Sequence, residues 1–344
     1  MPEPPARQRS APERAASPGA AAVAQRRAQE RRDLLLIGVL TIAAAGCAAL
    51  FLTVGVSGNV AYIVGRRSGT LVALAVVAAA VACSTVVFQT ITENRILTPS
   101  IMGFDAMYVL LQTTVAYTQG ASGLSLLGPL GQFWLELGIM LAGSVLLYGS
   151  LLAGRVPIFR LLLVGVVLGL LFRGLSSFMQ QLLTPDAFLV VQDRLFARFT
   201  GVQSELLVPA VLLTGAAIGL LLFDVRRYDV MSLGRDTATG LGVDPARLRL
   251  RALVATAVLV SVSTALVGPV TFFGLLVAHL AYRLVRVSRH ASLLPVAALV
   301  ALIALVGGQA LLEHVFKLGT TLSILIEFAG GLLFIFLLLR RRSL

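Results

Sequence analysis

Ionisable side chains inside apolar runs are the residues of this sequence best placed to do chemistry. Glu327 lies deepest, within Ile326-Glu327-Phe328-Ala329-Gly330-Gly331, while Asp105, Glu136 and Arg173 lie nearer the ends of their runs. An ionised group at the centre of a membrane helix costs roughly 2.5–3.5 kcal/mol on insertion scales, so each of these groups needs a reason to be there. A proton-coupled carrier would use such a carboxylate. A helix-packing contact or a water-lined wall explains Glu327 equally well.

Groups that catalyse reactions or bind metals are not clustered in the sequence. Lys317 is the only lysine, and it does not stand in the P-loop pattern that brings a lysine to nucleotide phosphates. The remaining candidate metal ligands have no recognisable metal-ligand spacing: His279, His290, His314, Cys47 and Cys83. We therefore expect no catalytic residue, no metal site and no cofactor on this chain, and ATP hydrolysis would have to take place on another polypeptide. A membrane-embedded enzyme is correspondingly disfavoured.

The elements that carry these residues are long apolar segments. The chain has 344 residues, is 58% hydrophobic and 13% charged, and has a mean hydropathy of +0.92, more apolar than one soluble core can bury. Because a helical span needs about 20 apolar residues, the composition predicts an all-α integral membrane protein with ten transmembrane helices. The ten runs fall near residues 34–56, 69–91, 101–118, 132–153, 158–180, 206–223, 251–267, 270–285, 293–311 and 320–339.

The distribution of charge predicts the topology. Basic residues number 28 against 16 acidic ones, a net charge of +12 that in a soluble domain would favour nucleic acid but in a membrane protein is typical of the positive-inside rule. Residues 1–33 are rich in Arg, Pro, Ala and Ser, so we expect a disordered cytoplasmic tail followed by a multi-pass domain over residues 34–344. Arg340, Arg341 and Arg342 place the C-terminus in the cytoplasm as well. No nucleic-acid partner is expected.

Two hydrophilic segments interrupt the apolar pattern. The external one, residues 181–205, mixes charged with apolar side chains and predicts a short surface helix. The internal one, residues 224–251, alternates Arg and Asp with Leu, Ala and Gly, so it predicts short amphipathic helices rather than a flexible link. Such a loop either binds a partner or lies on the lipid headgroups.

Three motifs carry a family resemblance. The first is Leu233-Gly234-Arg235-Asp236-Thr237-Ala238-Thr239-Gly240-Leu241-Gly242, and the second is Gly268-Pro269-Val270-Thr271-Phe272-Phe273-Gly274, followed by His279. The third comprises Gln89, Asn94, Pro99 and Gly103. Together they resemble the iron-chelate permeases of bacterial ABC importers, the type II family that includes the vitamin B12 permease. The likeness covers nearly all of the chain after residue 34.

The resemblance implies a permease subunit of an ATP-driven importer in the bacterial cytoplasmic (inner) membrane. It would pair with itself or with a paralogous permease, with two cytoplasmic ATPase subunits that bind ATP and Mg, and with an external substrate-binding protein. The cargo implied is a ferric siderophore or similar iron chelate, and cobalamin and heme are alternatives. Residues 94–105 most resemble the branch that handles catecholate-type or related ferric siderophores. The rival function is a proton-coupled secondary transporter that uses Glu327 or Asp105.

The same resemblance assigns roles to individual residues. The loop of residues 224–251 would form coupling helices that dock on the ATPase, although Arg235 stands where the family often has glutamate. The residues implied in ATPase coupling are Leu233, Gly234, Arg235, Asp236, Ala238, Leu241 and Gly242. Arg66 and Arg67 are candidates for docking the binding protein, or else anchors of the second span. Residues that would line the pathway or pack beside it are Gln89, Asn94, Pro99, Gly103, Gly268, Pro269, Gly274, His279 and Glu327.

Overall fold

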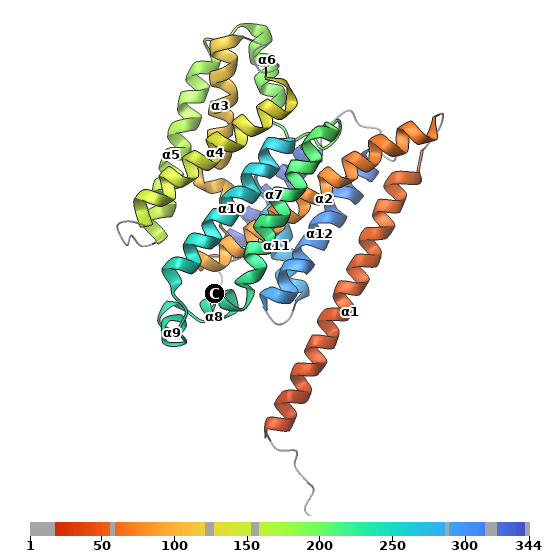
Figure 1. Ribbon diagram of the computed structural model, residues 1–344, viewed down its shortest axis with the longest axis vertical. Coiled ribbons are helices and arrows are strands. Elements are labelled where there is room, and N and C mark those ends of the chain that lie inside the picture. The colour runs from red at the N-terminus through yellow and green to blue at the C-terminus, as the bar shows by residue number, and fades with distance from the viewer. Residues whose placement is uncertain are drawn as a thin grey trace, which may run out of the picture.

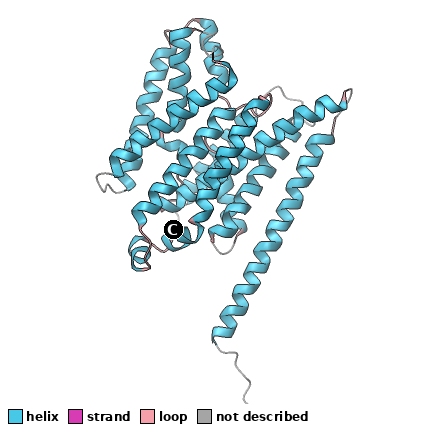
Figure 2. Ribbon diagram, viewed as in Figure 1, coloured by secondary structure: helices cyan, strands magenta, loops and turns pink. Residues whose placement is uncertain are grey.

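The computed structural model describes residues 18–55, 59–120, 127–152, 158–285, 289–313 and 322–340. Within these ranges every regular element is a helix (Figures 1 and 2), which confirms the all-α prediction. The elements are α1 (Pro18–Thr53), α2 (Val60–Ile91), η1 (Pro99–Met102), α3 (Phe104–Gln119), α4 (Gly128–Leu152), α5 (Ile158–Gln180), α6 (Pro185–Arg194), α7 (Ser204–Phe223), α8 (Val225–Met231), α9 (Arg235–Gly240), α10 (Pro245–Val267), α11 (Phe273–Leu284), α12 (His290–Leu311) and α13 (Leu322–Arg340).

Each of the ten predicted apolar runs coincides with one of these helices. In the described part of the chain, seven helices are long and apolar enough to cross a membrane, namely α1, α2, α4, α5, α7, α10 and α12. The other three are shorter, and two of them follow a break in the chain. Pro99 begins the single 3-10 turn η1 before α3, and Gly268 and Pro269 end α10 before α11 begins.

Two helices form the centre of the bundle. Most of α2 and α10 is buried, and both are rich in Ala, Val, Ser and Thr, whose small side chains allow helices to approach closely. The helices α7, α11 and α12 pack around them, whereas α1 lies at one edge and contacts mainly α12 (Figure 1). The helices α3, α4, α5 and α6 gather on the opposite side of the bundle from α1. The core is therefore built around one helix from the first third of the chain, α2, and one from the last third, α10.

The N-terminal segment differs from the prediction. Residues 18–33 continue α1 as a helix, where the composition predicts a disordered tail. The reason is local, because Pro18 suits the first turn of a helix and the following Ala, Gln, Arg and Glu residues are strong helix formers. Residues 1–17 lie outside the described ranges.

The two hydrophilic segments lie at opposite ends of the bundle (Figure 1). We call these ends the α6 end and the α9 end. At the α6 end, Ala187 and Val191 bury one face of α6 against Ala116 of α3, so this predicted surface helix is packed onto the bundle. At the α9 end, residues 224–251 form α8, α9 and the first turns of α10, in agreement with the prediction of short helices.

Candidate functional site

The segment between α7 and α10 is shaped by two glycines. Gly234 precedes α9 with φ +102°, and Gly242 follows it with φ +81°. An added Cβ at either position would meet nothing within 4 Å, so the backbone conformation alone calls for glycine there. The helix α9 is thus bounded on both sides by residues in conformations that other amino acids rarely adopt.

Two leucines beside α9 are exposed. Leu233 and Leu241 have relative exposures of 63% and 62%, and the charged Arg235 and Asp236 are also exposed. Ala238, which the family resemblance implies in ATPase coupling, is fully buried at 0% exposure and so offers no surface of its own to a partner. The reason is that α9 packs on α8 and α10 through this small side chain. Leu233 and Leu241 are the apolar groups that remain available at this site.

A buried carboxylate ties α8 to α10. Asp224 has no exposed surface, and it forms ion pairs with Arg227 and with Arg251, the latter at 3.4 Å. Both arginines are about half exposed, so they keep part of their hydration while they neutralise the buried carboxylate. The start of α8 is therefore held firmly against α10.

A second polar cluster ties α8 to α12 and α2. Asp229 of α8 accepts a hydrogen bond from the backbone N–H of His290, and the ring Nδ1 of His290 lies 2.7 Å from the same oxygen. The other ring nitrogen, Nε2, lies 2.7 Å from Oγ1 of Thr90 on α2. Burial raises the pKa of Asp229, but the hydrogen bonds and positive charge of His290 and Arg289 outweigh it and hold that pKa below its ordinary value. A displacement of α8 must therefore act on both α12 and α2.

A cavity of about 240 Å³ lies beside this cluster. Its walls include Gln89 and Thr90 of α2, Gly234 before α9, and Tyr282 of α11, over whose ring Arg95 stacks at 4.7 Å. Gln89 is buried, and in the described part of the chain its side-chain amide has no hydrogen-bond partner. This predicted pathway residue thus opens on a cavity directly behind the α9 segment.

The connection from α2 to α3 contains Asn94 and Gly103 of the third sequence motif. Asn94 accepts a hydrogen bond from the backbone N–H of Ile96 and so shapes the turn after α2. Gly103 has φ +92°, and a Cβ there would lie 3.1 Å from Cα of Gly169 and 3.2 Å from the carbonyl oxygen of Gly165 on α5. Gly103 therefore belongs to a close backbone contact between this connection and α5.

The break between α10 and α11 places Gly268, Pro269 and Gly274. Gly268 has φ +101°, and a Cβ there would lie 3.3 Å from Cα of Ala197. The backbone N–H of Arg198 donates to the carbonyl of Val267 at 2.7 Å, which fixes the break to the chain after α6. Gly274 lies against Thr85 of α2, while Pro269 is buried and His279 is half-buried on α11.

The paired arginines lie inside α2 rather than before it. Asn59 caps this helix through its side chain, which accepts from the N–H of Tyr62 at 3.2 Å, so α2 starts nine residues earlier than the predicted boundary at residue 69. Arg67 donates to the carbonyls of Phe51 and Val54 at 3.0 and 2.6 Å and thereby caps the end of α1. Arg66 is exposed. The two neighbouring arginines thus lie in different environments.

A buried network at the α6 end was not predicted as a unit. Glu136 of α4 accepts hydrogen bonds from Gln112 and Gln132, each at 2.6 Å, and lies 3.8 Å from Arg194 of α6. It borders a cavity of about 560 Å³ that reaches Gly268.

Glu327 of α13 lies close enough to Asp105 to be influenced by its charge. No group of three or more His, Cys, Asp or Glu side chains that could hold a metal ion is found in the described ranges.

The chain matches the FecCD transport family over residues 34–340. It belongs to that family. A similar FecCD-type relative is the petrobactin import system permease protein YclO of Bacillus subtilis (strain 168), which is 42% identical over 91% of this chain and 99% of the relative. The petrobactin import system permease protein FatC of Bacillus anthracis is 35% identical over 82% of this chain and 80% of its own length.

A solved structure shares the FecCD chain's fold. It is an inward-facing conformation of a metal-chelate type ABC transporter, with a TM-score of 0.77 and 24% sequence identity, covering 89% of this chain and 99% of that one. The resemblance inferred from the three sequence motifs is therefore confirmed.

Several site residues of this FecCD protein could not be predicted from the sequence. Asp224, Asp229, His290 and Thr90 are brought together by helix packing, and no local spacing links them. Asn59 did carry a readable signal, because Asn directly before an apolar helical run is a strong N-cap.

Proposed function

We propose that this chain is the membrane permease subunit of an ATP-driven importer of a ferric siderophore or similar iron chelate. The observation that carries the proposal is the 42% identity to YclO over nearly the full length of that petrobactin import permease. FatC, a second relative, is also a petrobactin import permease, which supports a siderophore as cargo over cobalamin or heme.

The topology proposed has ten spans, with both termini in the cytoplasm of a bacterium and the α9 end facing the cytoplasm. Support comes from the correspondence of ten apolar runs to ten helices, and from the arginines clustered between Arg226 and Arg251 at the α9 end. The α6 end then faces outward. The short helices α3 and α11 count as spans because η1 and the Gly268 break extend them within the bundle.

Coupling is proposed to run through α9. Exposed Leu233 and Leu241 would enter an apolar cleft of a separate ATPase. The positive φ angles of Gly234 and Gly242 would let the chain turn sharply on either side of α9. Asp224 and the pair of Asp229 with His290 would pass a displacement to α10, α12 and α2. ATP and Mg would be bound by the ATPase, and this chain would hold no cofactor of its own.

The proposed assembly contains two permease subunits, identical or paralogous, two ATPase subunits and an external binding protein. Exposed Arg66 is the better candidate for contact with acidic groups of the binding protein, because Arg67 is engaged with the end of α1.

Affinity purification of the tagged chain from native membranes, in the presence of a non-hydrolysable ATP analogue, tests this proposal. Mass spectrometry should identify a stoichiometric partner with a Walker A motif, and the Leu241→Asp variant should recover less of it. In cells, uptake should persist when an uncoupler is added while ATP is maintained. A chain that purifies alone, with uptake that collapses with the uncoupler, would instead favour the proton-coupled carrier.

A further inference from the structure

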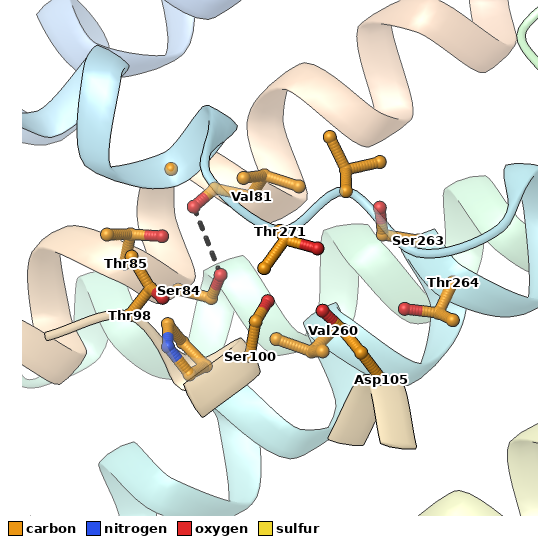
Figure 3. A pocket seen from close by; sticks show the side chains of 13 residues that line it. Val81, Ser84, Thr85, Thr98, Ser100, Asp105, Val260, Ser263, Thr264 and Thr271 are labelled. Carbon is orange, nitrogen blue, oxygen red and sulfur yellow. Dashed lines mark hydrogen bonds between the residues drawn. The ribbon is translucent and has the colours of Figure 1, made fainter. Parts of the chain in front are cut away.

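A small polar cavity lies where the two helix breaks meet (Figure 3). Its volume is about 20 Å³, and its walls come from α2, η1, the first turn of α3, the last turns of α10 and the link to α11. Hydroxyl groups dominate its polar lining: those of Ser84, Thr85, Thr98, Ser100, Ser263, Thr264 and Thr271. A space of this size holds one species the size of a water molecule.

Asp105 is the one acidic residue of this lining, and it is 5% exposed. The hydroxyls of Ser100 and Thr271 flank its carboxyl group, yet neither carboxylate oxygen has a hydrogen-bond partner in regular geometry within the described ranges. The charged groups that act on it from neighbouring helices are Arg173, exposed on α5, and Glu327 on α13. A buried carboxylate without a paired charge is strongly unfavourable, so the site calls for either a cation or a proton at Asp105.

We propose that this cavity binds one sodium ion, held by the Asp105 carboxylate and the surrounding hydroxyl oxygens. Hard cations prefer oxygen ligands, and all the polar side chains of this lining present oxygen. Ser84 donates its proton to the carbonyl of Val81 at 3.1 Å, so the lone pairs of its hydroxyl oxygen remain available to a cation. Breaks in membrane helices free backbone carbonyls, and such breaks are where transporters bind coupling ions.

The sodium ion would have a structural effect distinct from cargo transport. It would hold the start of α3 to the link between α10 and α11, two segments far apart in the sequence. A water molecule would satisfy the hydroxyl groups but would leave the carboxylate charge unpaired. A proton on Asp105 together with a water molecule would meet both needs, and it predicts stability that follows pH through Asp105 and does not respond to sodium.

Thermal unfolding of the purified chain in complex with its partners tests the site. The midpoint should rise with the logarithm of the sodium concentration, as expected for a ligand that binds only the folded state. Choline chloride at equal ionic strength should give no such rise, because its cation is too large for a space that holds one water-sized species. Potassium chloride should give a smaller rise than sodium chloride, because potassium needs longer bonds to its oxygen ligands than this small space provides. Asp105→Asn should abolish the sodium response, while Glu136→Gln, which alters an equally buried carboxylate outside this cavity, should keep it.

Three outcomes would overturn the proposal: equal midpoints in all three salts, equal responses to sodium and potassium, or a midpoint that follows pH through Asp105 but ignores sodium. If Asp105→Asn does not fold, Ser100→Ala and Thr271→Val should each weaken binding of radioactive sodium to the membrane-extracted complex several-fold. Unchanged binding in both would also refute the site. None of these readouts depends on transport, so they stand apart from the test of import.

Discussion

His290 contacts a single carboxylate oxygen of Asp229 twice, through its backbone N–H at 2.8 Å and its ring Nδ1 at 2.7 Å. Because the pKa of Asp229 is held below its ordinary 3.8, the ionised form stabilises the fold above that pH, and this contribution is lost as the pH falls through the lowered pKa. We expect Asp229→Asn to be less stable than the wild type at neutral pH. The gap should close on acidification below about pH 4. Thermal unfolding of both proteins across this range measures it, and parallel curves would contradict the assignment.

The exposed leucine after α9 provides the test of coupling. Leu241→Asp should abolish uptake while leaving the amount of protein in the membrane unchanged, since 62% of the side chain is exposed and its loss costs the bundle little packing. Leu241→Met is the matched control and should retain transport. Labelled siderophore uptake, normalised to membrane protein, provides the readout. Wild-type uptake by the aspartate variant would remove Leu241 from the coupling contact.

The neighbouring arginines of α2 should respond differently to mutation. Arg66→Glu should weaken association of the binding protein without changing the unfolding midpoint, because the side chain is exposed. Arg67→Gln should instead lower stability by about 1–3 kcal/mol, since it removes charged hydrogen bonds to the carbonyls of Phe51 and Val54. Binding and unfolding assays on both variants separate the two roles. A binding affinity unaffected by Arg66→Glu would exclude it from the docking surface.

The close contact of Gly103 with α5 predicts a local loss of stability. Gly103→Ala should cost about 1–3 kcal/mol, because it combines an unfavourable φ of +92° with a Cβ placed 3.1 Å from Cα of Gly169. Gly174→Ala on α5 is the control, because a Cβ at Gly174 would meet nothing within 4 Å and its helical conformation favours alanine. Equal midpoints for the two variants would show that the contact at Gly103 is not tight in solution.

The helices themselves could be predicted from sequence because hydropathy is a local property of the chain. In the described part of the chain each of the ten apolar runs coincides with a helix, and residues 224–251 form the short helices that their mixed composition indicates. The predicted boundaries were wrong at the start of two helices, α1 and α2. The cap at Asn59 extended α2 past Arg66 and Arg67, and helix formers extended α1 back to Pro18.

Long-range polar contacts could not be predicted, because they depend on which helices become neighbours. Asp229 and His290 are 61 residues apart, and Gln112 and Arg194 are 82 apart. Ala238 shows the same limit in another form. Its small apolar side chain suits either a docking surface or a buried contact, and only the packing of α9 on its neighbours decides between them.

The packing of α1 on α12 has a consequence for biosynthesis. The ribosome must add more than 230 residues after Thr53 before it reaches His290, where α12 begins. At typical synthesis rates α1 therefore spends roughly 10–50 seconds in the membrane without its main neighbour. During that interval its exposed Leu34, Leu35, Val39 and Ile42 can remain in contact with lipid. The helix α1 thus enters the bilayer well before its main neighbour is made, and its insertion and its docking are separate events in time.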